Sequence, residues 1–346
     1  MNTSPSGNPH EPGVPPRAFL ALEALDAWLD RLAHTRHLLA PRQVEGVVLY
    51  RPVASRTEIA PPALRPVLSI KEVLFPPTER LFTIQKTGVE IQLHETLPEG
   101  ETIVYGLRPC EAHGMQLLDA VFLSTLPSDP YYARRRASTV FIGLACRELG
   151  PSCFCTSVGG GPDRSEGMDL LLTEVEGGAI LEICSEQGKT LVADLPLTDF
   201  AGDLPKASSG STFPDPARLP WPAHFKEEFW EKMGERCLSC RACSYVCPTC
   251  RCFAVRDERL ASGSSERIRC WDACTGENYR RLAGGHRGRP LQGERLRNRF
   301  YCKFYYYPEQ YGLGQASACV GCGRCIDVCP VGVDITEVLT AMEQSL

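Results

Sequence analysis

The chain has 346 residues, a formal net charge of −5, and 43% hydrophobic and 23% charged residues. This length suits two domains with a sizeable core, the composition is ordinary for a globular protein, and the charge gives no reason to expect nucleic acid as the main partner. The 18 cysteines are the anomaly.

The N-terminal stretch "MNTSPSGNPHEPGVPPR" lacks the apolar segment of a signal peptide, and no apolar run approaches the ~18–20 residues that cross a bilayer. We therefore expect a cytoplasmic protein without membrane contact. Thiols stay reduced in that compartment, and clustered cysteines there usually bind metal.

The first 200 residues predict a tail followed by an α/β domain. Residues 1–16 are rich in Pro, Gly, Ser and Asn, which is typical of disorder. Apolar residues at helical spacing over 17–40 predict an amphipathic helix that Pro41 ends. "VEGVVLYRPV", "ERLFTIQ", "TIVYGL" and "STVFIGLA" predict strands, and "EAHGMQLLDAVFL" predicts a helix. "MDLLLTEVEGGAILEIC" predicts a hairpin. Residues 17–200 are therefore expected to form the α/β domain.

The composition changes in the second half. Residues 201–222 are dense in Pro, Ser and Gly, which predicts a linker. Beyond it, "AHFKEEFWEKMGERC", "GERLRNRFYCKFY" and "DITEVLTAMEQ" predict helices, the last capped by Asp334. We expect an α+β multidomain chain, with an all-α domain over 223–346.

Two cysteine runs lie in this second domain. Both have the form C-x2-C-x2-C-x3-C followed by Pro, and they begin at Cys237 and Cys319. Three thiolates on one tight loop can each reach a different iron of a cubane, and in paired runs the fourth cysteine ligates the cluster of the other run. The spacing thus predicts one [4Fe–4S] cluster on Cys237, Cys240, Cys243 and Cys329, and a second on Cys319, Cys322, Cys325 and Cys247.

Structural zinc is the alternative to iron–sulfur clusters, but zinc sites usually take cysteines in pairs from two knuckles. About seventy residues separate the two runs, as expected of a helical ferredoxin-like dicluster domain of the kind found in the iron–sulfur subunit of succinate dehydrogenase. The two runs therefore predict iron–sulfur chemistry.

The other cysteines leave alternatives open. A third cluster and a set of buried free thiols are both compatible with four cysteines in the first half, Cys110, Cys146, Cys153 and Cys155. Packing beside the cofactors is favoured over further metal binding for Cys250, Cys252, Cys270 and Cys274.

Residues 251–303 hold 13 Arg and Lys against 6 Asp and Glu. Because a cubane with four thiolates is a net anion, nearby arginines stabilise it and raise its potential. We prefer this explanation to nucleic-acid binding. No GxGxxG or P-loop pattern appears, so a site for flavin or nicotinamide is not expected in this chain.

Much of the chain resembles the β subunit of sulfhydrogenases and the A subunit of anaerobic sulfite reductase. The second half matches in "CLSCRACSYVCPTCRCF", "RCWDACTGENYRRLAGGH", "RNRFYCKFYYYPEQYG" and "CVGCGRCIDVCPVGVDITEV". The first half matches in "SIKEVLFPPTERLF", "YGLRPCEAHGMQLLD", "DPYYARRR", "FIGLACRELGPSCFC" and "GMDLLLTEVE".

This resemblance implies an electron-transfer subunit without catalytic residues of its own. It implies two partners, a flavin- and NAD(P)-binding reductase subunit and a catalytic subunit, either a hydrogenase or a sulfur- or sulfite-reducing enzyme. A catalytic iron–sulfur reductase is the alternative function. A cluster-bearing nucleic-acid protein is the third, and it predicts a steep salt dependence of binding.

Overall fold

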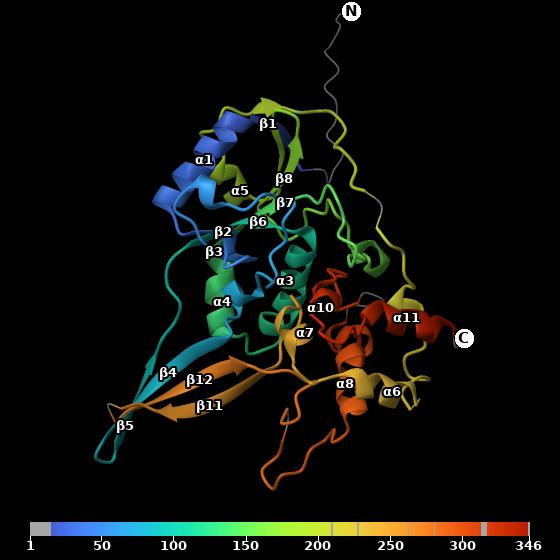
Figure 1. Ribbon diagram of the computed structural model, residues 1–346. Helices are drawn as coiled ribbons and strands as arrows, with labels where there is room; N and C mark the ends of the chain where they lie inside the picture. The colour runs from blue at the N-terminus through green and yellow to red at the C-terminus, as the bar shows by residue number, and fades with distance from the viewer. Residues whose placement is uncertain are drawn as a thin grey trace, which may run out of the picture.

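The computed structural model describes residues 15–208, 210–226, 228–261, 263–279, 281–312 and 317–344. Nearly all of the predicted tail lies outside these ranges. Figure 1 shows a sheet-and-helix body at the top, a group of helices beneath it, and a second sheet that projects from the body. No helix in the described ranges is both long and apolar enough to span a membrane.

The body is built on an eight-stranded mixed sheet, in the order β10-β1-β9-β8-β7-β6-β2-β3. Its four central strands, β8, β7, β6 and β2, run parallel, and the flanking pairs are antiparallel. The bounds are β1 Arg17–Ala21, β2 Leu38–Val44, β3 Val47–Pro52, β6 Thr102–Leu107, β7 Thr139–Leu144, β8 Leu170–Val175, β9 Gly178–Ile183 and β10 Thr198–Asp199.

Helices cover both faces of this sheet. Strand β6 shows why, because Ile103 and Tyr105 join one buried cluster and Val104 and Leu107 join another. The first cluster packs under α1 (Leu22–Thr35) and α5 (Glu186–Leu191). The second packs under α2 (Lys71–Leu74), α3 (Pro109–Phe122) and α4 (Pro130–Ala137). The α/β character predicted for the first half is confirmed.

Most of the individual predictions in the first half are confirmed as well, including the β8–β9 hairpin. The long helix over 17–40 is wrong, because α1 spans only Leu22–Thr35 and a strand lies on each side of it. Pro41 belongs to β2 and does not end a helix. It is tolerated there because β2 pairs with β6 only at Leu38 and Leu39, so Pro41 leaves no ladder bond unmade on that side.

A second sheet joins the two halves of the chain. It has the order β11-β12-β4-β5 and projects as an arm from the body (Figure 1). Its strands are β4 Thr78–Thr87, β5 Glu90–Glu95, β11 Phe253–Arg259 and β12 Ser265–Trp271, and β12 pairs antiparallel with β4.

The second half is therefore not all-α, and that prediction is wrong. The hairpin "FAVRDERLASGSSERIRCW" alternates poorly in hydrophobicity, because most β11 side chains are exposed. Its strands form through pairing with β4, which lies more than 160 residues earlier in the chain. A local pattern cannot show such a partner.

The remainder of the second half is helical. Its elements are α6 Phe229–Arg236, α7 Ala242–Tyr245, α8 Gln292–Tyr301, a π-helix Cys302–Tyr306, α9 Tyr307–Tyr311, α10 Arg324–Asp327 and α11 Ile335–Gln344. Trp230, Phe300 and Ile335 lie at the centre of its core. The predicted cap of α11 is present, since the Asp334 carboxylate accepts from the Thr336 N–H at 2.7 Å.

Residues 201–222 have little regular structure in their described part, with one 3₁₀ turn at Pro216–Arg218. Trp221 nevertheless packs into the core of the helical part with 3% exposure. The division of the chain into domains over 17–200 and 223–346 stays a prediction.

Candidate metal centres

The two cysteine runs adopt the same loop conformation. Ser239 and Arg241 of the first run have φ values of 53° and 70°. Gly321 and Gly323 occupy the same two motif positions in the second run, with φ values of 63° and 73°. A short helix follows each loop, α7 in one and α10 in the other, and the two helices pack together. Left-handed residues in such loops turn backbone N–H groups toward an enclosed anion.

Two backbone N–H groups already point at cysteine sulfurs. The Ser239 N–H donates to Cys237 Sγ at 3.4 Å, and the Val333 N–H donates to Cys329 Sγ at 3.1 Å. Such hydrogen bonds stabilise negative charge on sulfur, and they are one means by which a protein raises the potential of a cluster.

The first run and the last cysteine of the second run meet at one cavity. Its lining includes Cys237, Cys240, Cys243 and Cys329, together with Arg299. These four thiols are the ones predicted to share a cluster by crossed ligation. Burial raises the pKa of Cys237, and the other three thiols add to the shift, as expected of sulfurs held close together.

The other predicted set also lies together. Burial raises the pKa of Cys319 and of Cys325 to about 12, and nearby thiols, Cys247 among them, add to both shifts. Cys322 acts on Cys325 in the same way. Cys247, Cys319 and Cys322 are each 8% exposed, so this set is more buried than the first, in which Cys240 is exposed.

A third group of thiols gathers where the body meets the second run. Cys110 begins α3 after β6, Cys146 follows β7, and the carboxyl ends of these parallel strands lie at the same edge of the sheet. A cavity of about 350 Å³ at this edge is lined by all four sequence-predicted cysteines, and Cys322 of the second run also lines it. The full set is Cys110, Cys146, Cys153, Cys155 and Cys322.

Close packing joins this third group to the second run. A Cβ on Gly321 would lie 2.5 Å from the backbone of Cys155, and one on Gly323 would lie 2.3 Å from the Ser152 carbonyl oxygen. Both positions therefore need glycine, for this close approach as well as for their positive φ.

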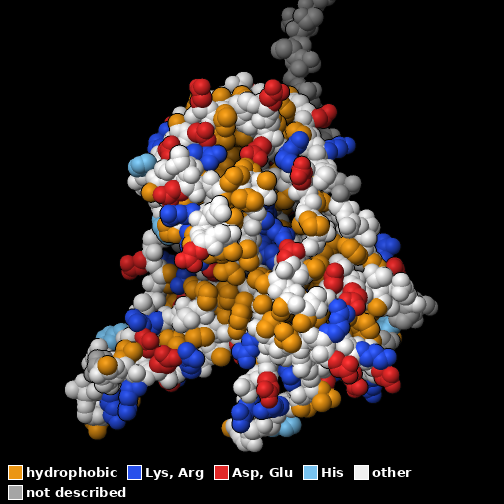
Figure 2. Space-filling view, viewed as in Figure 1, with side chains coloured by type: hydrophobic (Ala, Val, Ile, Leu, Met, Phe, Trp, Pro, Cys, Tyr) orange, Lys and Arg blue, Asp and Glu red, His pale blue; other side chains and the backbone are white. Residues whose placement is uncertain are grey.

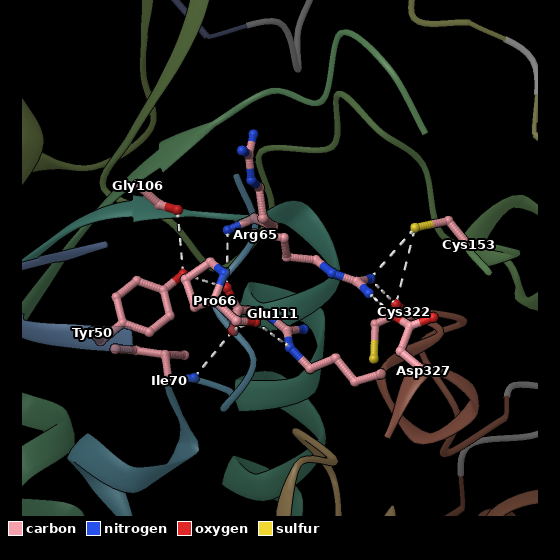
Figure 3. A network of polar contacts seen from close by, with 11 residues as sticks. Tyr50, Arg65, Pro66, Ile70, Gly106, Glu111, Cys153, Cys322 and Asp327 are labelled. Carbon is pink, nitrogen blue, oxygen red and sulfur yellow. Dashed lines mark hydrogen bonds and ion pairs between the residues drawn. The ribbon is translucent and has the colours of Figure 1, made fainter. Parts of the chain in front are cut away.

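Polar contacts reinforce the same junction. Figure 3 shows Arg65 pointing at Cys153, Cys322 and Asp327. Its guanidinium lies 3.6 Å from Cys153 Sγ and also donates to the Cys322 carbonyl oxygen. Nearby, a buried ion pair of 2.9 Å joins Glu111 on α3 to Arg324 on α10. These contacts set the position of the second run against the body.

Three buried cations surround the thiols. Lys71, Arg299 and Lys303 are 1%, 3% and 4% exposed, and within the described ranges none forms an ion pair with a carboxylate. Among the described residues, the Arg299 Nε has no hydrogen-bond partner. The Lys303 Nζ donates to Thr249 Oγ1 at 2.8 Å, and the Lys71 Nζ donates to the Cys250 carbonyl oxygen at 3.1 Å.

The pKa values of these cations follow burial and the neighbouring sulfurs. Burial disfavours the charged form of Lys303, yet the nearby thiols, Cys247 first, raise its pKa well above the usual range. Burial also opposes the charge of Arg299, whose pKa the thiols of both runs raise. For Lys71 burial prevails, and the pKa is lowered to about 8.

These cations test whether an anionic cluster fits the site. Burying an uncompensated charge costs several kcal/mol, so buried cations are normally paired. A cubane with four thiolates is a net anion and would supply the missing negative charge. Within the described ranges, no three His, Cys, Asp or Glu side chains converge as ligands of a single ion would. A cubane needs a wider spread, because each of its four irons takes its own thiolate.

Three of the remaining cysteines of the second half hydrogen bond with another cysteine. Cys250 hydrogen bonds with Cys247, and Cys252 hydrogen bonds with Cys274. Cys270 lies on β12 opposite Ala254, apart from these pairs. The packing role favoured for these cysteines stays a prediction.

The sequence predicted that basic residues in the stretch 251–303 would lie beside the expected clusters. This stretch contains both Arg299 and Lys303. Sequence reasoning missed Lys71, which comes from the other half of the chain. The stretch "SIKEVLF" gives no local signal for it, because Glu72 follows Lys71 and such a charged pair is common on an exposed helix face.

Comparisons with known proteins agree with this geometry. Residues 236–333 match the family model of the 4Fe–4S dicluster domain. The chain is 31% identical over 337 residues to sulfhydrogenase 2 subunit beta of Pyrococcus furiosus, a match that covers 94% of this chain and 97% of the relative. No solved structure matches. The chain is therefore an iron–sulfur protein that belongs to the sulfhydrogenase β subunit family.

Proposed function

We propose that this chain holds two [4Fe–4S] clusters with crossed ligation and relays single electrons between two partner subunits. One cluster is held by Cys237, Cys240, Cys243 and Cys329, and the other by Cys319, Cys322, Cys325 and Cys247. The observation that carries the proposal is the set of buried cations, Lys71, Arg299 and Lys303, that surrounds these thiols without carboxylate partners in the described ranges.

The thiol sets follow one another in space, as a relay requires. The thiols of Cys243 and Cys325 lie close enough to act on each other's charge, so the first set adjoins the second. Cys322 acts on Cys110 in the same way, so the second set adjoins the third. Cys240 is exposed at one end of this row, and the cavity of about 350 Å³ that the third set lines opens at the other end. This order supports a third cluster on Cys110, Cys146, Cys153 and Cys155.

A bound cubane supplies reversible one-electron transfer, and the protein controls the potential and the solvent access. Lys303 and Arg299 place positive charge beside the sulfurs, which favours the reduced state. The N–H groups of Ser239 and Val333 act in the same direction. The core around Trp230 and Phe300 excludes water from the helices that carry the loops.

The partners are inferred from the relative, whose name is that of one subunit of an enzyme. We propose a flavin- and NAD(P)-binding reductase subunit on one side and a catalytic subunit on the other, either a hydrogenase or a sulfur- or sulfite-reducing enzyme, in a cytoplasmic complex. The chain itself has no catalytic role in this proposal. A catalytic reductase in its own right is the alternative.

One experiment separates these functions. Anaerobically purified chain is mixed with NADPH or NADH, alone and with the proteins that co-purify with it, and bleaching of the cluster absorbance is followed. A relay subunit stays oxidised alone and becomes reduced when the reductase partner is present. Reduction of the isolated chain by NAD(P)H, or stoichiometric flavin bound to it, would establish the catalytic alternative.

A further inference from the structure

A second open cavity, of about 840 Å³, lies beside the start of β11, next to the π-helix and α9. Three arginines line it, Arg251, Arg281 and Arg289. Asp272 is the one carboxylate among the described lining residues, and it lies 3.6 Å from the guanidinium of Arg241. The cavity is therefore electropositive, and an anion would be attracted to it.

The three arginines have no carboxylate partner in the part of the chain that the structure describes. Arg251 stacks over the ring of Tyr307, with 4.3 Å between the guanidinium carbon and the ring centroid. Such stacking fixes the guanidinium plane and leaves its edge free to donate to a carboxylate. The loop between β12 and α8 contributes Arg281 and Arg289, and Figure 2 shows Lys and Arg side chains on this lower protrusion.

A pair of thiols adjoins the same cavity. Cys252 lines the cavity, precedes β11 and is half-buried, whereas Cys274 follows β12 and is buried. The hairpin brings them together, because the Asp272 N–H donates to the Cys252 carbonyl oxygen at 2.9 Å. The Cys274 thiol hydrogen bonds with Cys252 and, with Tyr279 and Arg251, lowers the pKa of Cys252 to about 6. The pKa of Cys274 is raised, so Cys274 remains the proton donor.

We propose that Cys252 and Cys274 form a redox-active dithiol that reacts with small disulfides bearing carboxylates, which the cavity arginines bind. The nucleophile faces the cavity and the second thiol lies behind it, which is the order that thiol–disulfide exchange needs. Neither cysteine belongs to the three thiol sets assigned to clusters.

The reaction balances in two exchange steps. The Cys252 thiolate attacks one sulfur of R–S–S–R, an R–S⁻ group leaves, and a mixed disulfide forms on Cys252. The first R–S⁻ group takes up the proton of Cys274, and the Cys274 thiolate attacks the Cys252 sulfur. The second R–S⁻ group leaves and takes a proton from solvent, and the Cys252–Cys274 disulfide remains. The small disulfide has been reduced to two thiols, and the protein dithiol has been oxidised by two electrons.

Return to the dithiol takes two electrons and two protons, and this half of the cycle rests on the proposed electron-transfer function. The path is short, because Cys274 lies close enough to Cys250 for their charges to interact, and Cys250 hydrogen bonds with Cys247 of the second set. A further cluster on Cys250, Cys252, Cys274 and Cys302 is the competing assignment. The hydrogen bond between Cys252 and Cys274 favours the dithiol, although Cys250 and Cys302 also lie close enough to act on the charge of Cys274.

The exchange steps can be tested without any electron transfer. Anaerobically purified protein with its clusters is incubated with oxidised glutathione, which bears carboxylates, or with bis(2-hydroxyethyl) disulfide, which is neutral. Non-reducing peptide mass spectrometry then measures the peptide bridged by Cys252 and Cys274. We expect the bridge to form, to be lost in Cys252→Ser, and to persist in Cys184→Ser, a matched variant of a half-buried cysteine elsewhere.

The arginines are tested with a double variant, Arg281→Gln with Arg289→Gln. We expect it to slow bridging by oxidised glutathione about tenfold, within the range of electrostatic effects on association, and to leave bridging by the neutral disulfide nearly unchanged. Absence of the bridge with both disulfides would overturn the proposal, as would equal slowing with both. Loss of about four irons in Cys252→Ser would also overturn it, because Cys252 would then be a cluster ligand. Failure of partner-dependent reduction by NAD(P)H would refute the relay and leave the exchange result standing.

Discussion

Arg299 and Lys303 lie near thiols of both cysteine runs, Lys71 lies near Cys247 and Cys250, and each of the three comes from a different element. In a solvent-exposed loop, a lysine or arginine would keep its charge at little cost in free energy, because water solvates it. At 1–4% exposure the same charge needs a nearby anion. The buried cations therefore indicate that an anion lies nearby, which the spacing of the cysteines alone does not show.

Arg299 gives the first prediction. Arg299→Gln should lower the midpoint potentials of the clusters, because the lost cation favoured the reduced, more negative state. A unit charge about 8 Å away at an effective dielectric constant of about 20 contributes roughly 2 kcal/mol, or roughly 90 mV for one electron. An EPR-monitored redox titration measures the shift.

The control for this variant is Arg218→Gln, since that side chain is 85% exposed. Its charge is screened by water and should leave the potentials unchanged. Arg299→Lys should retain most of the wild-type potential. Equal potentials in Arg299→Gln and wild type would show that Arg299 does not face a cluster.

The thiol of Cys252 gives the second prediction. Its pKa is lowered to about 6, so it is mostly thiolate at pH 7, and its alkylation by iodoacetamide should slow as the pH falls through 6. Burial raises the pKa of Cys184 to about 11, so this residue serves as an internal control that reacts appreciably only in strong alkali. Mass spectrometry of both peptides across pH 5–9 reports the two rates. A Cys252 rate that still rises above pH 8 would contradict the low pKa.

At the scale of elements, the β11–β12 hairpin ties the halves together through one side chain. Arg269 on β12 is 3% exposed, and its Nε lies 3.1 Å from the carboxylate of Glu79 on β4. Arg269 also pairs with Asp129, the residue that caps α4. The arm, the body and the second half therefore share a buried ionic network.

Arg269→Ala should destabilise the protein by about 3–5 kcal/mol, because it leaves Glu79 buried with less compensation. Arg267→Ala, on the same strand, removes a partner of Asp257 whose side chain is 42% exposed, and it should change stability much less. Urea unfolding followed by circular dichroism under anaerobic conditions compares the two. Similar midpoints for both variants would mean that the network is not important for stability.

The paired loops give a prediction about ligation. Pro248 and Pro330 follow the fourth cysteines, and Cys329 lines the same cavity as the first three cysteines of the other run. Cys247→Ser should therefore alter the EPR signal of the cluster held by Cys319, Cys322 and Cys325, which a Cys322→Ser variant identifies. If Cys247→Ser instead reproduces the spectrum of Cys240→Ser, ligation is not crossed.

For the molecule as a whole, the features that depend on neighbouring residues could be predicted from short sequence patterns. The β8–β9 hairpin, α3 and the cap at Asp334 follow from short stretches with clear periodicity or capping chemistry. The two cysteine sets were predicted from their spacing, and the structure brings Cys237, Cys240, Cys243 and Cys329 to one cavity.

Non-local features escaped prediction for a common reason. The β11–β12 hairpin depends on β4, and the charge of Lys71 depends on Cys250 of the other half. In the sequence, Gly321 and Gly323 look like ordinary loop glycines. In the structure they are also needed because the backbone of Cys155 and Ser152 lies too close to leave room for a Cβ. Each of these needs a partner that is distant in sequence, and no window of the sequence contains both members.

Crossed clusters would also bind the helical part together. Each cluster joins residues about eighty positions apart, so removal of iron should unfold α6–α11 cooperatively while the large sheet persists. This makes the metal content the most direct test of the account. Iron and acid-labile sulfide are measured per chain in anaerobically purified protein. The account predicts about eight irons, or about twelve if the third set is filled. About four irons or fewer, or one tightly bound zinc with little iron, would contradict it.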